Sequence, residues 1–490
     1  MTFTTLTFLI FLPLVFALHW MLPTRRTQNL LLLASSYVFY GWWDWRFCVL
    51  MLASSLVDYA IGIRLMGTDQ PRQRKLLLGL SLTTNLGLLG VFKYFNFFIG
   101  SFQTLSSQFG WEPGFTTLQI VLPIGISFYT FQTLGYTIDV YRRQLEASRN
   151  LIDYLAFVSF FPQLVAGPIE RAEQMLPQFA SKRVFDGALA TEGCRQILWG
   201  FAKKLVIADR LALVVDTIYG QPESFSGPML MLATVFFAFQ IYCDFSAYSD
   251  IAIGTAKLFG IRLMRNFAYP YFSQSVGEFW RRWHISLSTW FRDYVFIPLG
   301  GSRCSPMRRV LNLVATFLVS GLWHGAAWRY VVWGGINGVA TATPNPLDRQ
   351  ADQKGGTLQT PGGESLIPSP ATIFRIVSTF TIICVAWVFF RAESMGDAFT
   401  VLRQIGRDLF SANAYQSVVD SLDHDRFMRK TTIFLLLFVL WEWIQRRHPC
   451  PLHLPTLPTA VRWSAYTAMI WVTLYLMPQT GGREFIYFEF

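Results

Sequence analysis

Two of the six histidines in this 490-residue sequence lie where an ionisable side chain needs an explanation. His324 stands in the apolar stretch SGLWHGAAW, between Gly321 and Gly325, which leave room for a substrate or a neighbouring backbone. An ionisable group at membrane depth is costly and is a functional candidate by default. A buried imidazole is expected to be neutral, so the His324 ring is suited to act as a general base. The alternative is structural: a neutral histidine that donates one hydrogen bond between helices.

His284 is the second candidate, in the segment FWRRWHISLS. Its neighbours are tryptophans and arginines, so a residue at the membrane interface with no special role is an equal alternative. The two histidines are forty residues apart, and no HExxH motif or zinc-like Cys/His spacing accompanies them. We therefore expect no metal site, and the scattered cysteines predict no disulfide framework.

The segment FQIYCDFSAYSDIAIG places polar side chains in an apolar run. Its residues Asp244, Ser246, Tyr248 and Asp250, together with Trp323, are candidates for lining a polar interior or tunnel that binds substrate. Asp244 and Tyr248 are four residues apart and share a helical face. A broken helix, with Asp and Ser capping its ends, explains the same pattern and stays open.

Residues 262–309 contain eight arginines, no lysine and only two acids. The planar guanidinium fork suits phosphate better than an ammonium does. A phosphorylated donor is therefore one expected ligand, and lipid headgroups are the alternative; both can hold. The candidates for donor phosphates are Arg281, Arg282, Arg303, Arg308 and Arg309. The segment is too charged to span a membrane and too apolar for a free loop, which predicts interfacial or re-entrant helices.

The composition predicts the elements that position these residues. Hydrophobic residues make up 52% of the chain and charged residues only 14%, against about 25% in soluble domains. Apolar stretches of roughly 20 residues recur along the chain. Basic connections after the first, third and fifth stretch follow the positive-inside rule. We expect an all-α polytopic membrane protein with roughly eleven to thirteen transmembrane helices. The expected spans are 3–22, 28–42, 46–66, 76–99, 117–139, 151–166, 194–218, 229–258 (interrupted), 310–339, 372–390, 431–447 and 461–478.

The net charge of +11 is assigned to cytoplasmic loops and anionic lipid, because no nucleic-acid-binding motif is present. Residues 340–372, rich in Pro, Gly, Thr and Gln, predict a flexible polar loop. We expect one membrane domain over residues 1–490, with a core near 117–340 and C-terminal helices over 372–478. The sequence shows no internal repeat of the kind that many transporters have.

Several long motifs, in order, resemble the membrane-bound O-acyltransferase family. They are YGWWDWRFCVLMLASSLVDYAIG, VLPIGISFYTFQTLGYTIDVYRR, FFPQLVAGPIERAEQMLPQF, the aspartate segment, FWRRWHISLSTWFRDYVFIPLGG, GLWHGAAWRYVVWGGINGV and AWVFFRAESMGDA. The resemblance covers about residues 30–340 and continues near 386–398. It implies a helical bundle around a tunnel, with His324 at the family's invariant histidine and His284 at a second common one. Asn337-Gly338 departs from the His-Gly pair that relatives often have.

The resemblance implies acyl transfer to a hydroxyl, with no bound cofactor and with acetyl-CoA or another acyl thioester as the donor substrate. The expected acceptor is an exopolysaccharide such as alginate, at a bacterial inner membrane. Expected partners are membrane lipids, the acyl donor, a separate periplasmic acetyltransferase and polysaccharide machinery, and no nucleic acid. Two alternatives remain: another acyl group or polymer (cellulose, peptidoglycan, or D-alanine on teichoic acid), and a non-catalytic transporter or export component.

Overall fold

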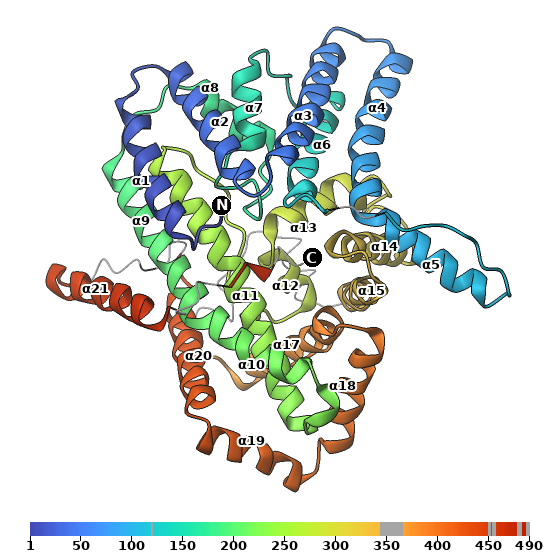
Figure 1. Cartoon of the computed structure of the whole chain (residues 1–490), viewed down its shortest axis with the longest axis vertical. Helices are drawn as coiled ribbons and strands as arrows, with labels where there is room; N and C mark the ends of the chain where they lie inside the picture. The colour runs from blue at the N-terminus through green and yellow to red at the C-terminus, as the bar shows by residue number, and fades with distance from the viewer. Residues whose placement is uncertain (119–120, 344–365, 449–451, 453–456, 478–482, 487–490) are drawn as a thin grey trace. The chain divides into compact units, whose positions relative to one another are not determined.

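The computed structural model describes residues 1–118, 121–343, 366–448, 452, 457–477 and 483–486 (Figure 1). The described residues form helices and no strand, which confirms the all-α prediction. The predicted polar loop 340–372 lies mostly outside the described residues; the helix before it extends to Ala342.

The chain forms two compact units, residues 1–193 with 252–264, and residues 194–251 with 265–490. The first unit contains α1 (Leu6–Met21), α2 (Arg25–Gly41), α3 (Trp45–Met66), α4 (Pro71–Leu89), the π-helical η1 (Gly90–Tyr94), α5 (Phe95–Ser107), α6 (Ile126–Tyr141), α7 (Leu151–Ser159), α8 (Ala172–Ala180) and the start of α9 (Gly187–Ala202). The second continues with the π-helical η2 (Lys203–Ala208), α10 (Asp209–Tyr219), η3 (Pro222–Ser224), most of α11 (Gly227–Leu258), η4 (Pro270–Phe272), α12 (Val276–Arg282), α13 (Ile285–Phe291) and the π-helical η5 (Arg292–Phe296). Then follow α14 (Pro306–His324), α15 (Trp328–Ala342), α17 (Pro370–Arg391), α18 (Met395–Asp408), α19 (Ala412–His424), α20 (Arg426–Gln445) and α21 (Thr459–Leu476). Every histidine and aspartate proposed for the site belongs to the second unit.

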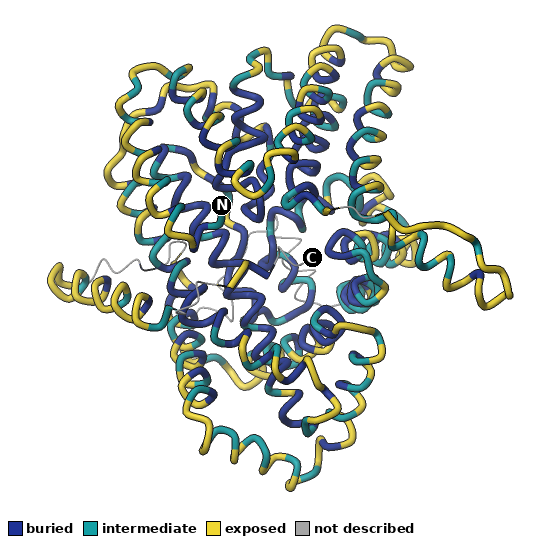
Figure 2. Tube along the Cα trace, in the orientation of Figure 1, coloured by how far each residue is buried: buried dark blue, intermediate teal, exposed yellow. Residues whose placement is uncertain are grey.

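Four described helical stretches are long and apolar enough to cross a membrane: Trp45–Met66, Pro71–Ser107, Gly227–Leu258 and Pro370–Arg391. The stretch Gly227–Leu258 is the most enclosed of the four, because 78% of its most apolar 18 residues are buried. Figure 2 shows this helix mostly in the colour of buried residues. Such helices satisfy every backbone polar group internally, as hydrocarbon requires. The protein therefore passes through the membrane several times.

Three predicted spans were wrong in detail. The stretch 310–339 is two helices, α14 and α15, that turn back on each other at Gly325–Ala327, so it is not one span. The stretch 194–218 contains a π-helical segment with two lysines. The stretch 229–258, predicted to be interrupted, is one continuous helix, α11. Its aspartates therefore do not cap broken ends, because they pair with cations on another element.

The arginine-rich segment follows the sequence prediction in its architecture. Its helices α12 and α13 have seven residues each, and η5 has five. At 1.5 Å per residue, seven residues advance only about 10 Å, far less than a bilayer. Ser275 starts α12 by accepting a hydrogen bond from the backbone N–H of Glu278.

Close approach of two backbones holds the hairpin that carries His324. Gly321 of α14 faces Gly334 of α15, with the Cα of one 3.3 Å from the position a Cβ would take on the other. A Cβ on Gly321 would overlap the carbonyl of Tyr330, and one on Gly334 would overlap the carbonyl of Phe317. Small residues permit such contact between membrane helices. The sequence left open whether Gly321 makes room for a substrate or for a neighbouring backbone, and the structure shows the neighbouring backbone of α15.

Candidate active site

His324 is the last residue of α14 and is only 4% exposed. Its Nδ1 lies 2.7 Å from the backbone carbonyl oxygen of Ser320. A carbonyl oxygen only accepts hydrogen bonds, so Nδ1 carries the proton and the neutral ring keeps its lone pair on Nε2. The helix backbone therefore selects the tautomer in which Nε2 can act as a base.

Aromatic rings hold this imidazole in place. The ring centroid of Trp333 on α15 is 4.8 Å away, that of Trp323 is 4.9 Å away, and that of Phe390 on α17 is 5.7 Å away. A Cβ on Gly325 would overlap the ring of Tyr330, so the turn after His324 needs glycine. Three helices thus supply the walls around one histidine.

His284 is fully buried between α12 and α13 and has a left-handed backbone, with φ +44°. Non-glycine residues pay strain in this region, and such residues cluster at functional sites. The ring Nδ1 is 3.1 Å from Oδ1 of Asn266, which also accepts a hydrogen bond from Oγ of Ser286. Burial lowers the pKa of His284 well below its usual 6.5, and the charge of a protonated His324 would lower it further.

Trp323 links the two histidines. Its ring centroid is 4.9 Å from that of His324 and 6.3 Å from that of His284. The structure therefore brings together three residues that the sequence singled out, from α14 and from the turn before α13. The arrangement suits acyl transfer, because one neutral base adjoins a second ring that can orient a donor or stabilise charge on an acyl oxygen.

The polar residues of α11 belong to a separate ionic network. Lys203 Nζ is 2.6 Å from both Ser246 Oγ and Asp250. Lys204 Nζ is 2.5 Å from Asp244 and 2.9 Å from Asp209. Consecutive residues of an α-helix point about 100° apart, so two adjacent lysines would normally face different neighbours. Both lysines lie in the π-helical segment η2, and there both contact residues of α11. The sequence reasoning missed both lysines, although two adjacent cations in an apolar stretch require acidic partners.

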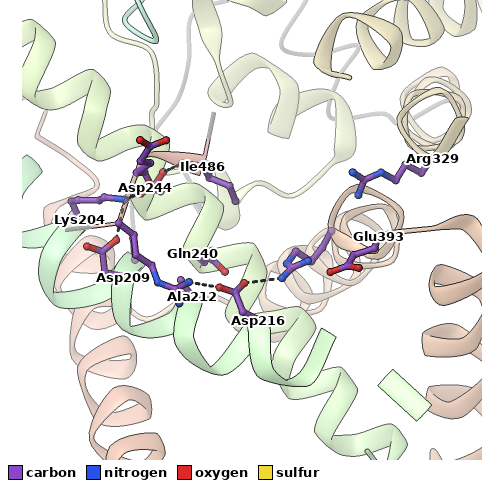
Figure 3. A pocket seen from close by; sticks show the side chains of 13 residues that line it. Lys204, Asp209, Ala212, Asp216, Gln240, Asp244, Arg329, Glu393 and Ile486 are labelled. Carbon is purple, nitrogen blue, oxygen red and sulfur yellow. Dashed lines mark hydrogen bonds and ion pairs between the residues drawn. The ribbon is translucent and has the colours of Figure 1, made fainter. Parts of the chain in front are cut away.

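The second unit also contains a cavity of about 380 Å³ beside this network (Figure 3). Asp244 lines it, and Asp216 bridges Arg391 and Arg483 at its side. Among the described residues that line the cavity, Asp244 is the one predicted site residue, and none is a histidine. Arg391 of the cavity lining directly follows Phe390, whose ring contacts His324, so the end of α17 adjoins both the cavity and this histidine.

The C-terminal segment Arg483–Ile486 enters this network, which the sequence did not indicate. Lys204 donates to the backbone oxygen of Glu484, and the N–H of Ile486 donates to Asp244 over 2.6 Å. Tyr248 is buried and packs edge-on against Phe485, with ring centroids 5.0 Å apart. Tyr248 is therefore a packing partner of this segment in the structure.

The five candidate arginines have different surroundings. Arg282 is buried and pairs with Glu278 at 2.7 Å, so its charge is already neutralised. Arg281 is half-buried, whereas Arg303 and Arg308 are exposed and Arg309 is half-buried near the start of α14. Arg303 and Arg308 are the more accessible candidates for an anionic ligand. In the part of the chain that the structure describes, no group of three or more His, Cys, Asp or Glu has the arrangement of a metal site.

The family model for the membrane-bound O-acyltransferases matches residues 142–345. A protein of Azotobacter vinelandii described as "Probable alginate O-acetylase" is 43% identical over 81% of this chain and 76% of its own length. The peptidoglycan O-acetyltransferase of Helicobacter pylori is 33% identical over 80% of this chain and 77% of its own length. The teichoic acid D-alanyltransferase of Streptococcus thermophilus is 32% identical over 46% of this chain and 58% of its own length.

Proposed function

This chain belongs to the membrane-bound O-acyltransferase family and is an acyltransferase, and we propose that it transfers acetyl from a cytoplasmic thioester toward an envelope polysaccharide, with alginate as the first acceptor to test. The observation that carries the proposal is the tautomer of His324, in which Nδ1–H bonds the carbonyl of Ser320 and the basic lone pair is placed on Nε2. Family membership also argues against the transporter alternative.

The proposed chemistry balances without a cofactor. Nε2 of His324 takes the hydroxyl proton as the oxygen attacks the acyl carbon of the thioester. A new C–O bond forms and the C–S bond breaks, and His324 then returns the proton to the leaving thiolate. His284 orients the donor or stabilises the negative charge on the acyl oxygen, as a preorganised polar group does.

The donor is proposed to be acetyl-CoA, with its phosphates at Arg303 and Arg308. Arg308 lies in the first turn of α14, and His324 ends the same helix. Sixteen residues at 1.5 Å each separate them by about 24 Å along the helix axis. An extended thioester bound by its phosphates at one end of α14 would therefore reach the base at the other.

The proposed setting is a bacterial inner membrane, with the donor in the cytoplasm. The alginate acceptor rests on the names of the relatives, and the peptidoglycan and teichoic acid enzymes keep other polymers and D-alanine as alternatives. A separate periplasmic acetyltransferase and polysaccharide machinery are the proposed partners. Acetyl transfer to alginate, peptidoglycan and teichoic acid in parallel assays would separate the acceptors.

The decisive experiment follows donor turnover by the purified chain in membrane vesicles, with labelled acetyl-CoA. His324→Gln keeps hydrogen-bonding capacity but takes up no proton at neutral pH, so turnover should fall by about 10²–10⁴-fold. His424→Gln is the matched control, because Nδ1 of His424 makes the same type of bond, 2.9 Å to the carbonyl of Asp420, on the surface. A His324→Gln protein with near-normal turnover would show that this histidine only packs.

A further inference from the structure

Helix α19 places its apolar residues outward. Tyr415, Val418, Val419 and Leu422 follow the i, i+3, i+4, i+7 spacing of an amphipathic helix. Such a stripe normally packs against a core, yet no residue of α19 is buried in the described structure (Figure 2). Val418 and Leu422 are half-buried, whereas Tyr415 and Val419 are exposed, so the uncovered part of the stripe is Tyr415 and Val419.

Small polar residues also tie α19 to the second unit. Ser417 Oγ lies 2.7 Å from Ser226 Oγ, and Ser226 Oγ donates to the carbonyl of Ala414 over 3.2 Å. Tyr415 and Val419 stay 36% and 48% exposed. Apolar side chains that stay exposed in this way indicate an interaction surface.

The turn between α18 and α19 extends the uncovered surface. Leu409 is 40% exposed and Phe410 is 94% exposed. The hydroxyl of Tyr415 donates to the carbonyl of Leu409 over 3.0 Å, which fixes the turn against the helix. Leu409, Phe410, Tyr415 and Val419 together form one surface, here called the α19 patch.

The acidic residues beside the α19 patch indicate what kind of partner it would bind. From Leu409 to Asp425 the chain has no Lys or Arg, whereas Asp420, Asp423 and Asp425 are exposed. Helices that lie on membranes carry Lys and Arg on the polar face and often Trp or Phe on the other, because anionic lipids attract cations. Helix α19 has the opposite charge, which argues against anionic lipid as the cover of the patch.

We propose that the α19 patch is a docking surface for a protein partner that presents an apolar side chain beside Lys or Arg residues. The apolar anchor would cover Phe410 and Val419, and the basic groups would meet the aspartates of α19. Such charge complementarity raises the association rate and makes binding sensitive to salt. The proposal does not depend on the acyl chemistry proposed above, because none of these residues belongs to the candidate active site.

The test is photocrosslinking in intact cells, with p-benzoylphenylalanine in place of Phe410. The expected result is one discrete protein adduct that falls at least fivefold when Asp423→Lys is added. The matched control is Asp69→Lys, which makes the same charge change at an acid that is 90% exposed in another loop, and it should leave the adduct intact. Once identified, the partner should bind the purified chain with a Kd that rises with salt.

Three outcomes would overturn the proposal: lipid adducts alone, no adduct, or a protein adduct that Asp423→Lys leaves unchanged. Turnover of acetyl-CoA by purified Asp423→Lys protein, without partner, should equal that of the unmodified chain and verifies folding. If the adduct behaves as expected while no variant turns over acetyl-CoA, the proposed function fails and the docking surface stands.

Discussion

The second unit holds ionisable side chains in its interior in two different ways. His324 lies among aromatic rings, and its Nδ1 bonds a backbone carbonyl. Lys203 and Lys204 instead pair with Asp250 and with Asp209 and Asp244, and both lysines are almost fully buried. A neutral ring has no charge to compensate, whereas a buried ammonium needs carboxylates close by.

The difference separates reactivity from stability. A lysine and an aspartate in a tight pair are each committed to the other, so their removal leaves an uncompensated charge. The imidazole can change its protonation state without breaking such a pair. We therefore expect substitutions of the lysines to lower the stability and abundance of the protein. Substitutions of His324 should abolish acyl transfer and leave the abundance near normal.

The largest effect should follow Lys204→Met, which leaves Asp209 and Asp244 buried without their cation. The loss of stability should be about 3–5 kcal/mol, seen as low abundance in membranes and a lower Tm in detergent. Asp244→Asn is the milder variant, because Lys204 keeps Asp209. Normal abundance of Lys204→Met would contradict a structural role for the network.

The hairpin of α14 and α15, which carries His324, allows a steric test of its packing. Gly334→Ala places a Cβ against the carbonyl of Phe317, and forcing extra volume into a packed contact costs about 1–3 kcal/mol. Gly335→Ala is the control, because its Cβ would make an ordinary 3.6 Å contact with Leu318. Thermal unfolding should rank Gly334→Ala well below Gly335→Ala, and equal Tm values would contradict the packing.

His324→Gln should have a smaller effect on stability than either of these. The hydrogen bond to the Ser320 carbonyl has a net worth of about 1 kcal/mol. Abundance and Tm should therefore remain near normal while acetyl transfer is lost. If the abundance of His324→Gln fell as far as that of Lys204→Met, His324 would have a structural role like that of the lysines.

The last prediction is a pH dependence caused by His284. Because burial holds its pKa below the usual 6.5, the unfolded chain binds a proton below that pH more readily than the folded chain. Stability should therefore decrease as pH falls below 6.5, by up to about 1.4 kcal/mol per pH unit from this group. Tm measured between pH 7 and pH 5 should fall less steeply in His284→Gln, whereas His424→Gln should keep the original slope.

The family and the helical class were predictable from the sequence, and two histidines were predicted to be functional. Hydropathy and charge spacing depend on local composition, and the motifs around His284 and His324 are contiguous, so both can be read along the chain. The family and the class are confirmed by the comparisons and by the fold. The catalytic roles stay predictions, as do the donor arginines.

Only the tertiary structure decided which residues meet. Residues 310–339 are apolar enough for one span, but glycine contacts between Gly321 and Gly334 fold them into a hairpin that ends α14 at His324. Asp244 has its partners forty residues earlier, at Lys204, and at the C-terminal Ile486. Hydropathy records how apolar a residue is and not which distant group neutralises it, so these pairings follow from packing alone.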